Sequence, residues 1–99
     1  MPLDQDLTKI ALAQAQTAYL TYGCPTKRLI QNLEIYGGVA VIKDLCRRHR
    51  LSDGFDQLVQ CGHTELTMEA LAVKSRFASL FTDEEANWCL QALCDVGYF

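Results

Sequence analysis

Apolar side chains recur at every third or fourth position along most of the chain, in segments separated by glycine, proline or small polar residues. That period places apolar residues on one face of an α-helix, whereas a half-buried β-strand alternates at every second residue. No segment of useful length alternates in that way. The pattern therefore predicts an all-α fold, a compact bundle of five to six short helices in a single domain. The expected helical ranges are 1–22, 25–36, 39–50, 55–61, 67–74 and 83–96.

The last of these helices has the most complete signals. Thr82 and Glu85 fit the capping box, in which each side chain accepts a hydrogen bond from the backbone amide of the other residue. Asp83 and Glu84 add negative charge at the positive end of the helix dipole. Gly97 suits the left-handed residue that ends a helix. The expected buried stripe consists of Ala86, Cys89, Leu90, Leu93 and Cys94.

The earlier helices are predicted from local start and stop signals. Pro25 is expected at the first position of the second helix, where its missing amide costs nothing, and Gly37-Gly38 is expected to end that helix. Thr67 is the expected cap of the fifth helix. Residues 3–36 would then form an N-terminal helical hairpin. Its expected inward positions are Leu3, Leu7, Ile10, Ala11, Ala18, Tyr22, Leu29, Ile30, Leu33 and Tyr36.

The composition indicates a globular chain of one domain. The 99 residues are 49% hydrophobic and 21% charged, which excludes an intrinsically disordered chain. No apolar run approaches membrane-spanning length and no basic-then-apolar leader is present, so we expect a cytoplasmic protein without membrane contact. The five cysteines are odd in number and form no Cys-x-x-Cys pair. We therefore expect reduced, buried thiols and no cofactor.

Charge is distributed unevenly, although the net charge is only −3. Residues 23–51 carry six basic side chains against two acidic ones. Such a patch could bind phosphate, and the glycine-containing turns beside it permit a helix-turn-helix DNA-binding regulator. A dedicated DNA binder is usually basic overall, and cations at a helix end also complement the helix dipole. The candidate nucleic-acid-binding residues are Lys27, Arg28, Lys43, Arg47, Arg48 and Arg50.

The acidic part of the chain suggests a different partner. Residues 52–99 carry eight carboxylates against two basic side chains. An acidic face of this kind could bind a basic groove on another protein, such as the DNA channel of a nuclease. Several of these charges are also explained as helix N-terminal residues. The expected partner-binding residues are Asp53, Asp56, Glu65, Glu69 and Glu84.

Two further hypotheses concern cysteine and histidine. Cys46 and His49 lie one helical turn apart and Cys61 and His63 flank a glycine, so these four could close a tetrahedral zinc site. A buried Cys46 with a solvated His49 explains the same residues. Cys24 lies at a helix start, where an exposed thiol would tend to have a lowered pKa. No phosphate loop, Gly-x-Ser-x-Gly or His-Glu-x-x-His motif is present, so an enzyme is the least supported class.

Residues 36–99 resemble a helical accessory module that ends many uncharacterised bacterial proteins. The shared pieces are Tyr36-Gly37-Gly38, Ser52-Asp53-Gly54-Phe55, Leu66-Thr67-Met68-Glu69-Ala70-Leu71, Phe81-Thr82-Asp83-Glu84-Glu85 and Gly97-Tyr98. The chain departs from the usual pattern at Cys61 and His63, which argues against a family-wide role for either. The resemblance implies a non-catalytic domain, found alone or attached to proteins that handle nucleic acid or take part in phage–host conflict. It carries over no established activity.

Together these observations predict a macromolecule-binding module. The first hypothesis is a protein–protein modulator or inhibitor of a nucleic-acid-processing partner such as a defence nuclease, of the anti-CRISPR kind. The alternative is a small helix-turn-helix DNA-binding regulator, and a homodimer is compatible with both. Trp88 and the Tyr98-Phe99 end are candidates for an apolar contact, although core packing is the simpler explanation.

Overall fold

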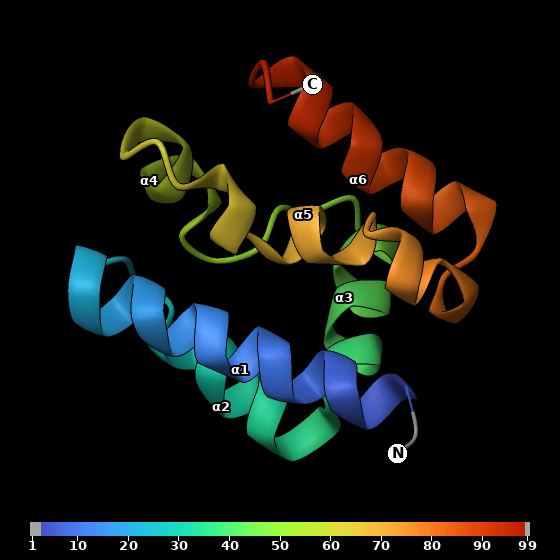
Figure 1. Ribbon diagram of the computed structural model, residues 1–99, viewed down its shortest axis with the longest axis horizontal. Coiled ribbons are helices and arrows are strands. Elements are labelled where there is room, and N and C mark those ends of the chain that lie inside the picture. Colours follow the sequence, from blue (N-terminus) through green and yellow to red (C-terminus); the bar gives the residue numbers. More distant parts are fainter. Residues whose placement is uncertain (1–2, 99) are drawn as a thin grey trace.

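The computed structural model describes residues 3–98, and every regular element in that range is helical (Figure 1). The elements are α1 (Leu3–Tyr22), α2 (Lys27–Tyr36), α3 (Gly38–Arg47), α4 (Phe55–Gln60), η1 (Thr64–Leu66), α5 (Met68–Ala72), η2 (Ser75–Leu80) and α6 (Asp83–Asp95), where η marks a 3₁₀ helix. The predicted all-α bundle is confirmed. None of these helices combines the length and the hydropathy that crossing a bilayer requires. The predictions that concern Met1 and Phe99 lie outside the described residues.

The helices form two groups, and α3 lies between them (Figure 1). On one side α1 and α2 pack against each other, and on the other side α5 packs on α6. α3 contacts all four of these helices. The main core connects the two groups, and its members with at most 2% exposure include Leu7, Ala11, Leu33, Ile42, Leu71 and Phe77.

α1 carries small residues on its buried face and polar contacts that position the next two helices. Its buried alanines, each at most 1% exposed, are Ala11, Ala15 and Ala18. The hydroxyl of Thr26 donates a buried hydrogen bond to the carbonyl of Ala15 at 2.8 Å. The amide of Gly38 donates to Oγ1 of Thr8, also at 2.8 Å. A Cβ at Gly38 would lie 3.2 Å from Cα of Thr8, so this crossing of α1 and α3 favours glycine.

The start of α2 differs from the prediction. The helix begins at Lys27 rather than at Pro25, and Thr26 precedes it with φ −104° and ψ 9°. The buried hydrogen bond from Thr26 to α1 holds this residue outside the helix. Tyr36, expected to face inward, is 67% exposed. The buried residues of α2 are Leu29 and Leu33.

α3 ends earlier than predicted, at Arg47 rather than at residue 50. The amides of His49 and Arg50 donate to the carbonyls of Cys46 and Leu45, at 3.2 and 2.9 Å. These two bonds form a Schellman motif, in which the residue after the cap takes the left-handed conformation. His49 occupies that position with φ 53°, although glycine is the usual residue there.

α6 begins as predicted. The amide of Glu85 donates to Oγ1 of Thr82 at 3.2 Å, and the amide of Thr82 donates to Oε1 of Glu85 at 2.8 Å. The capping box is therefore confirmed.

The predicted buried stripe of α6 is only partly right. Cys89 and Leu93 are buried, whereas Leu90 and Cys94 are exposed. α6 packs mainly on α5 and α3, and these two helices cover a narrower strip of its surface than the apolar pattern predicted.

Candidate functional site

A groove of about 1130 Å³ opens between α2, α3, the segment 48–53 and the start of α6. The residues of α3 from Ala40 to Arg47, except the buried Ile42, line it. Its lining also contains four arginines and two large aromatic side chains. We call it the α3 groove and define it by Arg28, Tyr36, Arg47, Arg48, Arg50 and Trp88.

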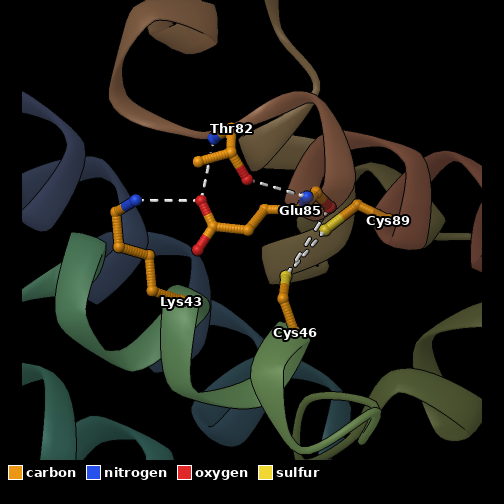
Figure 2. Close-up of polar contacts among 5 residues, drawn as sticks. All are labelled: Lys43, Cys46, Thr82, Glu85 and Cys89. Atoms are coloured by element: carbon orange, nitrogen blue, oxygen red, sulfur yellow. Dashed lines mark hydrogen bonds and ion pairs between the residues drawn. The ribbon is translucent and has the colours of Figure 1, made fainter.

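Five of the six basic residues predicted from the sequence line the α3 groove, and Lys27 does not. The structure thus gathers a set that is scattered over 23 positions of the chain, from Arg28 to Arg50. Much of this positive charge is already paired. Nζ of Lys43 donates to Oε1 of Glu85 at 2.8 Å, which joins α3 to the start of α6 (Figure 2).

Asp44 neutralises part of the charge at the end of α3. Its Oδ1 accepts from Nη2 of Arg47 at 2.6 Å and from Nε of Arg48 at 3.2 Å. The hydrogen bond from Arg47 is the main cause that holds the pKa of Asp44 below its ordinary value. Arg28 and Arg50 have no ion-pair partner among residues 3–98. The unpaired positive charge of the groove is therefore concentrated on these two arginines.

The basic patch and the acidic face expected from the sequence partly overlap in the structure. Asp53 and Glu84, two of the expected partner-binding acids, line the same α3 groove as the arginines. The groove is consequently of mixed charge. Asp56 and Glu65 are exposed but lie at opposite ends of the α4–η1 segment and are not among the groove residues.

Glu69 must be removed from the predicted acidic face, because its side chain is inside the molecule with only 3% exposure. Its carboxylate accepts hydrogen bonds from the amide of Ser52 at 2.8 Å and from the hydroxyl of Ser52 at 2.6 Å. Burial raises the pKa of Glu69, and the two bonds from Ser52 oppose that rise. Glu69 therefore anchors Ser52, which lies between the groove-lining residues Leu51 and Asp53.

The hypothesis of a zinc site is also wrong. Within residues 3–98 no group of three or more potential ligands converges. The ring of His49 stacks on Trp88, with centroids 4.9 Å apart, and the ring of His63 stacks on Tyr22 at 4.2 Å. Cys61 is exposed. The four proposed ligands therefore lie in separate environments.

Cys24 is not the exposed thiol that the sequence suggested. It is only 1% exposed, and burial raises the pKa of the thiol. A thiol that is both buried and harder to ionise is a poor nucleophile. The thiol-enzyme hypothesis for Cys24 thus finds no support in its surroundings.

Cys46 contacts Cys89 of α6, with the two Sγ atoms 3.6 Å apart (Figure 2). Sγ of Cys46 also lies 3.7 Å from the carbonyl oxygen of Glu85. The hydrogen bond with Cys89 lowers the pKa of Cys46, and the same bond raises that of Cys89. The sequence placed both cysteines on inward helix faces but gave no sign that they meet.

Glu85 serves three contacts at once beside this pair. Its carboxylate accepts from Lys43 and from the amide of Thr82, and its amide donates to the hydroxyl of Thr82. Partial burial would raise the pKa of Glu85, but the hydrogen bonds from Lys43 and Thr82 outweigh it and hold the pKa below its ordinary value. The start of α6 is thereby fixed against α3 (Figure 2).

Comparisons with family models, with curated proteins and with solved structures found no match to the chain.

Proposed function

We propose that the protein is a non-catalytic protein-binding module and that its partner binds in the α3 groove. The observation that carries this proposal is the residue composition of the groove, which combines four arginines with Tyr36 and Trp88. Arginine, tyrosine and tryptophan are the residues that contribute most to binding energy at protein interfaces. Tyr36 is 67% exposed, so a partner would bury a large aromatic surface there.

The mixed charge of the groove supports a protein partner rather than a nucleic acid. A phosphate backbone carries one sign of charge and is bound by unpaired cations, whereas a protein surface offers both signs. Asp53 and Glu84 in the groove would repel phosphates. A nucleic-acid-processing protein, the partner class expected from the sequence of residues 36–99, is the partner that we propose.

The DNA-binding alternative has less support from the arrangement of α2 and α3, although the four residues 23–26 between α1 and α2 match the length of a helix-turn-helix turn. A helix-turn-helix motif presents the N-terminal residues of its second helix to the major groove. The N-terminus of α3 instead packs on α1, where Gly38 is bonded to Thr8. Only Gly37 separates α2 from α3, whereas the motif has a turn of about three to four residues.

The test uses a matched pair of tyrosines. A photo-crosslinking amino acid is placed at Tyr36 in the groove or at Tyr19, which is 43% exposed on α1 and does not line the groove. Cells of the native host are irradiated and the crosslinked proteins are identified. We expect one protein to be captured from position 36 and not from position 19.

The captured protein is then purified. Calorimetry measures its affinity for the wild-type module and for two variants of the module, one at an arginine and one at a lysine. Arg28→Ala removes an unpaired groove cation and is expected to weaken binding about 30-fold, the effect of losing about 2 kcal/mol at a hot spot. Lys27→Ala changes the neighbouring cation outside the groove and should alter the dissociation constant less than twofold. Equal effects of both variants, or crosslinking only from position 19, would contradict the proposal.

A further inference from the structure

Cys46 and Cys89 bring two free thiols into contact across the interface of α3 and α6. Their Sγ atoms are 3.6 Å apart, although the residues are 43 positions apart in the sequence (Figure 2). A disulfide requires about 2.05 Å between the two sulfurs. Closing the pair therefore needs the sulfurs to approach by roughly 1.5 Å.

The pair is buried, and one of its members borders the α3 groove. Cys46 and Cys89 are 5% and 2% exposed, and Cys46 is one of the residues that line the α3 groove. Of the two cysteines only Cys46 is a groove-lining residue, so we take exchange to begin at Cys46. The hydrogen bond with Cys89 and the charge of Lys43 lower the pKa of Cys46, although burial and the carboxylates of Glu85 and Glu69 oppose them. The thiolate is the form that attacks a disulfide.

We propose that Cys46 and Cys89 are a redox modification site that closes to a disulfide by exchange with a small-molecule disulfide of the glutathione class. The thiolate of Cys46 attacks one sulfur of the reagent, the reagent S–S bond breaks, and one reagent thiolate leaves and takes up a proton. Cys89 then loses its proton, and its sulfur attacks Sγ of Cys46 and displaces the second reagent thiol. In sum the two protein thiols lose two electrons and two protons, and the reagent gains them.

The new bond would join the two walls of the α3 groove. α3 lines the groove along residues 40–47, and α6 contributes Glu84, Glu85 and Trp88. Oxidation would draw these helices together and fix the position of Trp88, which lies one residue before Cys89. This consequence for partner binding rests on the proposed function, whereas formation of the disulfide does not.

The experiment treats the folded, reduced protein with mixtures of oxidised and reduced glutathione and maps the products by mass spectrometry without reduction. We expect a peptide that links Cys46 to Cys89. The thermal midpoint should rise by about 10 °C or more, because the bond closes a long loop of chain. The rise should disappear when a reductant is added.

Two variants provide the controls. Cys61→Ser/Cys94→Ser removes two exposed thiols and should form the same link with the same rise in midpoint. Cys46→Ala should form no link at Cys89. Modification of Cys61 and Cys94 while Cys46 and Cys89 stay reduced would overturn the proposal. So would a mixed disulfide at Cys46 that never closes, or a link that forms only in urea. Each readout needs no partner, so a failure here is distinguishable from a failure of the proposed function.

Discussion

Glu69 is a buried carboxyl group, and one residue, Ser52, supplies the hydrogen bonds that replace those it would make with water. Both of its oxygens accept from Ser52, one from the amide and one from the hydroxyl. A buried carboxylate without such donors would be strongly destabilising. Burial is still the larger influence, and it raises the pKa of Glu69 above the ordinary value of 4.5. The folded state therefore holds this proton more tightly than the unfolded state does.

This difference predicts how stability depends on pH. As pH rises from 4.5 through the raised pKa, the folded protein must release a proton that the unfolded chain has already lost, so its free energy of unfolding falls. Glu69→Gln should remove this part of the dependence. Asp44 and Glu85 have lowered pKa values, so their contribution to the free energy of unfolding rises with pH below about pH 4.5. This contribution is the same in the wild type and in Glu69→Gln.

Urea denaturation of the wild type and of Glu69→Gln at pH values from 4 to 8 measures the effect. The free energy of unfolding of the wild type, minus that of Glu69→Gln, should decrease as pH rises. Parallel pH profiles would show that Glu69 titrates as it does in the unfolded chain.

At the scale of the elements, the start of α6 combines a local and a long-range contact in one side chain. Glu85 completes the capping box with Thr82 and also binds Lys43 of α3. The cap therefore contributes to the position of α6 in the bundle as well as to its helicity. Loss of the Thr82 hydroxyl should therefore lower the free energy of unfolding of the whole protein.

Thr82→Ala is predicted to lower the free energy of unfolding by about 1 kcal/mol, the usual effect of losing an N-cap hydroxyl. For a domain of this size that corresponds to a fall of about 4–8 °C in the thermal midpoint. Calorimetry measures it. Thr17→Ala is the matched control, because the hydroxyl of Thr17 is exposed and donates only to Ala13 in its own helix. Equal shifts for the two variants would contradict a role of the cap.

For the molecule as a whole, the distribution of charge in space differs from that in the sequence. The basic segment 23–51 contributes most of the groove, but acids from the same and from later segments accompany it there. Long-range attraction for a polyanion depends on the net charge of a surface. The gathered arginines are therefore better suited to specific contacts with a protein.

Binding to duplex DNA is accordingly predicted to be weak, with a dissociation constant above about 10⁻⁴ M at physiological salt. Fluorescence anisotropy at several salt concentrations measures it. Substituting Arg47 and Arg48 by alanine should change the weak binding little, because both side chains are already held by Asp44. Tighter binding with a steep salt dependence that these substitutions abolish would favour the DNA-binding alternative.

The sequence predicted the helices well because caps, glycine breaks and apolar periods are local. Thr82, Glu85 and the break at Gly37 are read correctly from a few neighbouring residues. Contacts between distant segments were not predictable in this way. Glu69 lies in the first turn of α5, where an acid normally faces solvent. Its burial is explained only by the two hydrogen bonds from Ser52, a residue 17 positions earlier in the chain. Leu90 and Cys94 fit a helical stripe, but periodicity does not say how wide a strip the neighbouring helices cover.

The central position of α3 also bears on how the molecule comes apart. By sequence, the boundary near Tyr36 divides a hairpin from an accessory-like region, but α3 lies just beyond it and buries Gly38, Val41, Ile42 and Cys46 against helices from both parts. Neither part would keep these side chains from water if the other unfolded. Both should therefore melt in one cooperative transition, and a fragment cut at residue 37 would lack a complete hydrophobic core.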